Sequence, residues 1–322
     1  MRRANLVTIV LVSVLFLAAS MTSSSVQAGA PVKLALKFRP GQKLRYRYHE
    51  SLNYTPPPKY ADLSAYQLDT KVDFTMEVKD VSAEGTATVR LTFERITVLL
   101  DGMQIADLTV FPKQGKRISA TIKPNGEAVF YKYVYLTINN GGQLEYRVSR
   151  DGGPIATKTV SKRGSEKIEY AADLDEDHGV IRDGVPPTRS LKAPEHGRLA
   201  EFKVDLVPVK LFEFVNLPTV ALAEGQIFSV PLKYLANESL TYEGLADVAG
   251  YQGRKVHAEV TPWTETSEQG SGYLPEVQGE VSYVIDTMGK LIQGKGNLSY
   301  KIVIPGVGHQ AASSTIELTL RR

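Results

Sequence analysis

The sequence contains no cysteine. This absence excludes disulfide bonds, thiolate metal sites, catalysis by a thiol and lipid attachment at a lipobox cysteine. A chain of 322 residues is long enough for one large β domain or two domains of ordinary size. We therefore expect the fold to be held by its hydrophobic core alone.

The chain also lacks a strong excess of charge, because 38 Lys and Arg residues are offset by 35 Asp and Glu. A nearly neutral chain has no electrostatic basis for binding nucleic acid. Beyond the N-terminal region, no apolar run approaches the length of a membrane-spanning helix. We expect no nucleic-acid partner, and no transmembrane segment once a signal peptide has been removed.

Catalytic motifs are missing as well. There is no Gly-x-Ser-x-Gly element and no glycine-rich phosphate loop before a helix. We therefore expect a non-enzymatic protein without a cofactor, although a glycosidase pair of carboxylates is conceivable in a chain with many acids. The histidines show no spacing typical of a metal site. They are His49, His178, His196, His257 and His309.

One acidic cluster invites comparison with a calcium loop. Asp173, Asp175 and Asp177 alternate as oxygen ligands of Ca²⁺ do. An EF-hand loop would also need glycine at its sixth position and an acid at its twelfth, where this chain has His178 and Gly184. We interpret the cluster as a solvated turn and expect no metal site.

Residues 1–28 have the pattern of an export signal. Arg2 and Arg3 precede an apolar run over residues 6–19, and small residues lead to a cleavage site after Ala28. The apolar run is too short to cross a bilayer. We expect an exported, soluble protein that works in the periplasm or outside the cell.

Alternation of apolar and polar residues dominates the rest of the chain and predicts β-strands. Residues 72–79 and 87–93 alternate on either side of the turn 82–85, and Asp101-Gly102 separates two further apolar strands. Asp-Gly at such a place is a strong hairpin signal, because a type I′ turn needs positive φ at both residues. Further hairpins are predicted at 124–127, 139–142 and 251–254.

These patterns predict an all-β fold of antiparallel meanders that form two similar curved sheets or half-barrels, with little helix. Residues 209–216 are the best helix candidate, but they alternate too, and Pro218 ends either element.

A weak internal repeat suggests how the chain is divided. One copy opens at Pro40-Gly41-Gln42 and the other at Glu224-Gly225-Gln226, and each ends in a glycine turn followed by a long alternating strand. The repeat predicts two curved sheets side by side or two halves of one large sheet, although β-meanders in general look alike. We divide the chain into a signal peptide (1–28), a first β half (29–148), a polar connecting segment (149–200) and a second β half (201–322).

Residues 36–48, LKFRPGQKLRYRY, resemble the first strand of an uncharacterised group of exported bacterial all-β proteins. Members of that group have a signal peptide, a KFxxGQxYxY-like first strand and two β halves joined near a Leu-Pro. Leu217-Pro218 is similar to that junction. The resemblance implies export and an all-β fold, and it implies no catalytic residues.

Tyrosine is abundant, with 16 residues against one tryptophan. Tyrosines on a sheet can line a ligand or partner site, but they also simply suit strands. We expect a binding or carrier protein for an apolar or amphipathic ligand in the cell envelope, with a lipid or an envelope protein as candidate partner. The alternative is a surface module that binds a protein or glycan, and a hydrolase comes third. The sequence assigns no ligand-binding residue.

Overall fold

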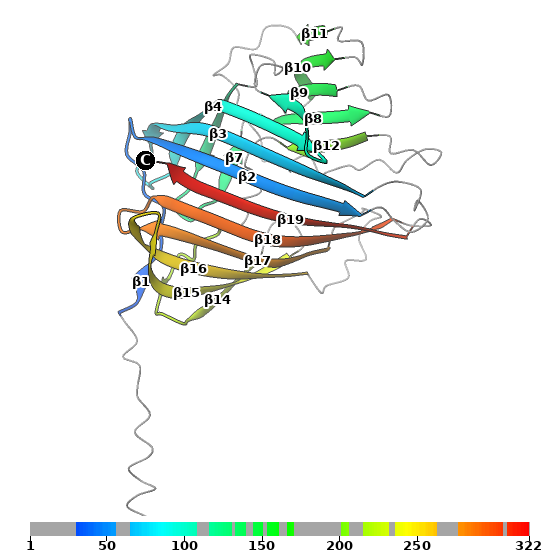
Figure 1. Cartoon of the computed structure of the whole chain (residues 1–322). Coiled ribbons are helices and arrows are strands. Elements are labelled where there is room, and N and C mark those ends of the chain that lie inside the picture. The colour runs from blue at the N-terminus through cyan, green and yellow to red at the C-terminus, as the bar shows by residue number, and fades with distance from the viewer. Residues whose placement is uncertain are drawn as a thin grey trace, which may run out of the picture.

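The computed structural model describes most of the predicted strands (Figure 1). The predicted signal peptide, the Asp173–Asp177 cluster and residues 209–214 lie outside the described part. The described residues are 30–55, 65–107, 116–130, 133–139, 144–150, 153–160, 166–170, 201–205, 215–231, 236–262, 276–304 and 308–321.

A 12-stranded antiparallel sheet makes up most of the described structure. Its strands follow the order β14, β15, β16, β17, β18, β19, β2, β3, β4, β6, β7, and β5 also pairs with β4. The bounds are β14 (Ile227–Pro231), β15 (Ala236–Val248), β16 (Tyr251–Pro262), β17 (Glu276–Asp286), β18 (Leu291–Ile304), β19 (Gly308–Arg321), β2 (Lys43–Thr55), β3 (Tyr66–Val81), β4 (Ala87–Leu100), β5 (Met103–Asp107), β6 (Arg117–Ile122) and β7 (Ala128–Phe130).

Two smaller antiparallel sheets accompany it. The five-stranded sheet has the order β11, β10, β9, β8, β12, and a two-stranded sheet joins β1 to β13. Their bounds are β8 (Tyr133–Asn139), β9 (Leu144–Arg150), β10 (Gly153–Val160), β11 (Glu166–Tyr170), β12 (Glu201–Asp205), β1 (Val32–Lys33) and β13 (Ala221–Leu222).

The predicted all-β, antiparallel fold is confirmed, and no helix occurs among the described residues. Both halves of the chain belong to the same large sheet, because the C-terminal strand β19 pairs with β2 from Ala311, opposite Thr55, to Arg321, opposite Arg45. Leu318 lies opposite Tyr48 in this pairing. Of the two arrangements that the repeat allowed, the structure has two halves of one large sheet.

The predicted hairpins form at β3–β4, β4–β5, β6–β7 and β8–β9. At the β4–β5 turn, Asp101 and Gly102 both have positive φ, 49° and 80°, as the turn chemistry required. The hairpin expected at 251–254 was misplaced by a few residues. Ala249 and Gly250 make that turn with φ of 52° and 79°, while Gly253 lies buried within β16.

The predicted polar connecting segment contains more strand than its composition suggested. Its residues Glu166–Tyr170 form the strand β11. β10 was not expected, yet it pairs with both β9 and β11. Its sequence has few large apolar residues, so the periodicity signal was weak. Residues 171–200 lie outside the described part.

One face of the large sheet forms the core. Along β2, Leu44, Tyr46 and Tyr48 are buried while the residues between them are exposed. We call this buried side the inner face and the opposite side the outer face. Figure 1 shows the sheet curving so that β7 lies behind β2 and β3. Inner-face residues of both halves belong to one hydrophobic cluster.

Two segments, residues 34–37 and residues 215–222, cross one end of the sheet. We call this end the turn end, because the turns 82–86, 123–127 and 286–290 lie there. Residues 34–37 reach both halves, since the Leu36 amide donates to the Pro124 carbonyl (2.7 Å) and the Lys37 amide to the Gly289 carbonyl (2.9 Å). The Leu217 amide donates to the Asn125 carbonyl (2.7 Å). The crossing segments bury Leu34, Leu36, Val215, Leu217 and Leu222 in the core.

The openings of the two predicted copies have matching hydrogen bonds. Gln42 bonds back to Arg39 through its amide and its side chain, and Gln226 bonds back to Ala223 in the same way. Gly41 and Gly225 have φ of 79° and 78° and donate to a strand of their own half. The sequence similarity therefore corresponds to the same local turn in each half.

Candidate functional site

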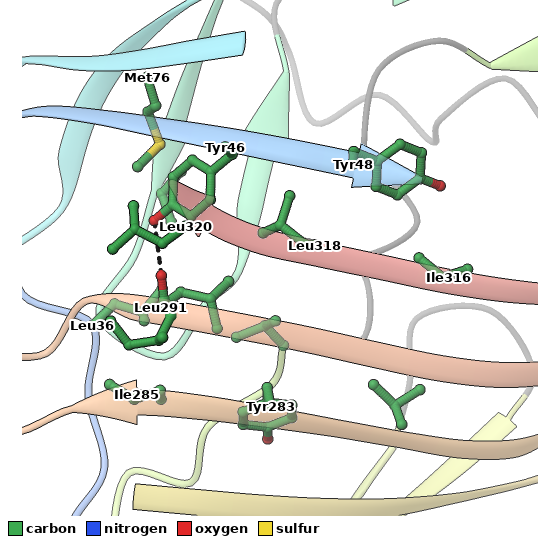
Figure 2. Packing of buried hydrophobic residues seen from close by; sticks show 14 of the residues in the cluster. Leu36, Tyr46, Tyr48, Met76, Tyr283, Ile285, Leu291, Ile316, Leu318 and Leu320 are labelled. Carbon is green, nitrogen blue, oxygen red and sulfur yellow. Dashed lines mark hydrogen bonds between the residues drawn. The ribbon is translucent and has the colours of Figure 1, made fainter. Parts of the chain in front are cut away.

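The inner face can be followed in rows of residues that lie opposite one another across neighbouring strands. A row near the turn end is aromatic: Tyr46 stacks on Phe74 (centroids 5.5 Å apart), which meets the edge of Phe93 (6.4 Å). The Tyr46 hydroxyl donates to the Leu291 carbonyl at 3.0 Å (Figure 2). Polar groups occur on the inner face farther from this end.

Glu50 is a buried acid on the inner face that is held by protein partners. Tyr48 Oη donates to one of its carboxylate oxygens and Ser314 Oγ to the other, each at 2.9 Å. Thr70, also buried, lies opposite Glu50 on β3. The cost of burying this acid is therefore offset by hydrogen bonds from two strands.

Glu238 is a second buried acid on the inner face, and its environment is different. It follows Ala236 and precedes Leu240 and Tyr242 in the buried positions of β15, and 0% of its surface is exposed. Neither carboxylate oxygen has a hydrogen-bond partner within the described structure. Burial raises the pKa of Glu238 to about 8. The side chain is therefore a neutral carboxylic acid at pH 7.

Tyr283 on β17 is similarly placed. It is 1% exposed, and its hydroxyl has no hydrogen-bond partner among the residues the structure describes. Burial raises the pKa of Tyr283 most, and the charge of Glu238 raises it further. Figure 2 shows the Tyr283 oxygen directed away from the Tyr46–Leu291 hydrogen bond. An unpaired buried polar group typically costs about 1–3 kcal/mol, so two in one region call for an explanation.

Glycines adjoin this region on β18. Gly294 lies opposite Tyr283, and Gly296 lies opposite Val281, both in buried inner positions. A glycine inside a strand weakens it and often marks a place where another group approaches closely. A Cβ at Gly296 would lie 3.2 Å from the Val281 side chain, so even an alanine there would require that side chain to shift by a few tenths of an ångström.

The outer face carries charged side chains in pairs. Arg47 Nε donates to Asp73 at 2.9 Å, and an Arg321 nitrogen lies 3.6 Å from the other Asp73 oxygen. His49 Nε2 lies 3.5 Å from Asp69 on this face. These pairs join β19, β2 and β3, and Asp73 is a buried member of them with 8% of its surface exposed.

The remaining residues singled out from the sequence do not converge on a site within the described structure. Of the histidines, His49 and His257 are partly exposed on strands, as expected for a surface position. No group of three His, Asp or Glu side chains in the described ranges could hold a metal ion. No described helix is long and apolar enough to span a membrane.

Sequence reasoning missed Glu50 and Glu238. Each takes an inner position in an otherwise apolar series, and this interruption of the alternation was a signal available in the sequence. The alternation of Tyr46 and Tyr48 with arginines predicts that both lie on one face of a half-buried strand. The structure places both in the core, 2% and 1% exposed.

No protein-family model and no curated protein matches this chain. Among solved structures, one of lipovitellin, determined in a study of lipid–protein interactions, is similar to this chain. The two share 9% identity with a TM-score of 0.42, and the match covers 89% of this chain. The chain corresponds to 26% of the lipovitellin chain.

Two further structures are similar. A beta-barrel-like protein with a domain of unknown function from Brucella abortus has 9% identity and a TM-score of 0.24, with 90% of this chain and 100% of that chain covered. DynF from the dynemicin biosynthesis pathway of Micromonospora chersina has 8% identity and a TM-score of 0.21, with 91% and 86% covered. At these values the likenesses indicate neither ancestry nor activity.

Proposed function

We propose that this protein is an exported, non-enzymatic carrier or binding protein that shelters an apolar or amphipathic ligand in the cell envelope. The observation that carries the proposal is the pairing of β19 with β2, which makes both halves one curved sheet with a continuous apolar inner face. Two sheets packed tightly face to face would instead favour a module that binds through its edges.

The polar groups of the inner face support an amphipathic ligand over a purely apolar one. Glu238 and Tyr283 are buried without described hydrogen-bond partners, whereas the row at the turn end is aromatic and aliphatic. Ligand sites are mostly apolar with a few placed polar groups, and this distribution has that character.

Export is part of the proposal and rests on the sequence of residues 1–28, with its basic start, short apolar run and cleavage site. The place of action would be the periplasm or the outside of the cell. There a carrier for an apolar ligand has a purpose, because lipids cross the aqueous space poorly without a protein that covers them.

The proposal is tested by titrating the full chain with N-phenyl-1-naphthylamine, an uncharged apolar dye whose fluorescence rises in apolar surroundings. We expect a saturable rise at one or a few sites per chain, reversed by long-chain lipids. Native mass spectrometry of protein purified from its own envelope should then show a bound lipid. Absence of dye binding together with a co-purified protein would overturn the proposal.

That outcome would favour a protein-binding module, and one observation supports this alternative. β14 is at the edge of the large sheet as described, and its Ile227 is 66% exposed. An exposed sheet edge with an apolar side chain can accept a strand from a partner.

A further inference from the structure

Glu238 and Tyr283 differ from the other described polar groups of the inner face in their hydrogen bonding. The hydroxyl of Tyr46 donates to a backbone carbonyl, and both oxygens of Glu50 accept hydrogen bonds from side chains. In the described structure the carboxyl of Glu238 and the hydroxyl of Tyr283 have no such partner, although both side chains are almost completely buried. Buried polar groups without partners are rare in folded proteins and often belong to functional sites.

The two side chains belong to the same part of the sheet. Glu238 lies on β15 and Tyr283 on β17, with β16 between them. The strand pairings place Tyr283 four positions along β17 from Gly279, the residue level with Glu238. The charge of Glu238 contributes to the raised pKa of Tyr283. On the next strand, Gly294 and Gly296 occupy inner positions without side chains. This part of the inner face therefore combines unused hydrogen-bonding capacity with two positions that carry no side chain.

We propose that Glu238 and Tyr283 form a polar subsite that binds the uncharged, hydroxyl-bearing head of a single-chain amphiphile, whose apolar chain lies along the inner face. This inference rests on the proposed carrier function and specifies its ligand class. A protonated carboxyl offers one O–H donor and one carbonyl acceptor, and a phenol also donates and accepts. Hydroxyl groups, which both donate and accept, satisfy these partners without bringing a charge into the interior.

Charged heads fit this subsite less well. A carboxylate head would be repelled by Glu238 whenever that side chain is ionised. An ammonium head would require Glu238 to ionise in an apolar environment, where a buried ion pair is costly. The described buried side chains of the inner face include tyrosines and the acids Glu50 and Glu238, but no lysine, arginine or histidine. An uncharged head therefore matches this face.

The test is a competition experiment with the full chain loaded with N-phenyl-1-naphthylamine. Two competitors with the same acyl ester are compared: 1-decanoylglycerol, which carries two glycerol hydroxyls, and methyl decanoate, which carries none. The ratio of their apparent affinities is measured in the natural protein and in variants. Decanoate and decyltrimethylammonium serve as the anionic and cationic competitors.

We expect Tyr283→Phe and Glu238→Met each to weaken the preference for 1-decanoylglycerol over methyl decanoate about tenfold, because a buried hydrogen bond to the ligand is lost. Glu238→Gln retains a donor and an acceptor and should keep most of the preference. The matched control is Tyr46→Phe, which removes a buried inner-face hydroxyl whose partner is the Leu291 carbonyl, and it should leave the ratio unchanged. Circular dichroism establishes that each variant is folded.

The outcomes separate the two proposals. If the dye binds but the ratio is the same in all variants, or if Tyr46→Phe lowers it as much as Tyr283→Phe, the subsite is wrong and the carrier function stands. Tighter binding of decyltrimethylammonium than of 1-decanoylglycerol would also overturn it, because the subsite would then be anionic. If the dye does not bind at all, both proposals fail.

Discussion

The Tyr46 hydroxyl donates a 3.0 Å hydrogen bond to the backbone carbonyl of Leu291, which connects the two halves of the chain inside the core (Figure 2). Tyr46 lies on β2 and Leu291 begins β18, with β19 between them. Burial and, to a smaller extent, the charge of Asp286 raise the pKa of Tyr46, so the hydroxyl keeps its proton at all ordinary pH values.

Tyr46→Phe should destabilise the protein by about 1–2 kcal/mol, because the buried carbonyl of Leu291 loses its donor. Tyr283→Phe is the matched control, since Tyr283 is equally buried and its hydroxyl has no partner in the described structure. Its substitution should be neutral or slightly stabilising. Urea unfolding of both variants measures the difference, and equal losses of stability would contradict the assignment.

Glu238 should make the protein less stable as the pH rises. Its pKa is about 8 when folded and 4.5 is its ordinary value, so between these limits only the folded state keeps the proton. Unfolding then releases a proton, and stability falls with pH by up to about 1.4 kcal/mol per unit. Below this pH window Glu238 is protonated in both the folded and the unfolded state, and above it Glu238 is ionised in both, so its contribution to the pH dependence ends.

Glu238→Gln removes this titration, so its stability relative to the natural protein should increase from pH 5 to pH 8. Urea midpoints of the two proteins at each pH measure the difference, in which the titration of all shared groups cancels. Parallel curves over this range would show that Glu238 ionises normally in the folded state.

Gly126→Ala should be strongly destabilising. Gly126 has φ of 92°, and an added Cβ would lie 2.0 Å from the Val215 carbonyl oxygen on the crossing segment. Gly102→Ala is the control, because Gly102 has φ of 80° with no atom within 4 Å of the new Cβ. We expect a loss of about 1 kcal/mol for Gly102→Ala from backbone strain, and about 3 kcal/mol or more for Gly126→Ala. Thermal unfolding compares them, and similar losses would mean that Val215 does not pack on this turn.

Asp73→Asn should destabilise the protein by about 1–3 kcal/mol, because Asp73 is 8% exposed and accepts from Arg47 while Arg321 lies nearby. Glu77→Gln on the same strand should have little effect, since its pairing with Lys79 is at the surface. Unfolding in low and high salt provides the measurement. A loss for Glu77→Gln as large as that for Asp73→Asn would exclude a special role of Asp73.

Part of the candidate site could have been found in the sequence. The acids at positions 50 and 238 interrupt apolar series, so their inward direction follows from the period-two alternation of a strand. Whether such an acid has partners depends on strands distant in sequence. One oxygen of Glu50 accepts from Tyr48, two residues away, but the other accepts from Ser314, 264 residues away, and that partner cannot be read from the local pattern.

Local sequence patterns predicted most of the strands and most of the hairpins. Alternation and turn chemistry act over a few residues, as at Asp101-Gly102, where both residues adopt the positive φ that the turn requires. Three relationships became known only from the folded chain: β19 pairs with β2, two segments cross the turn end, and Glu238 and Tyr283 lie on the same inner face. Each depends on contacts between residues far apart in the chain, and such contacts form only when the strands of both halves assemble on a shared core.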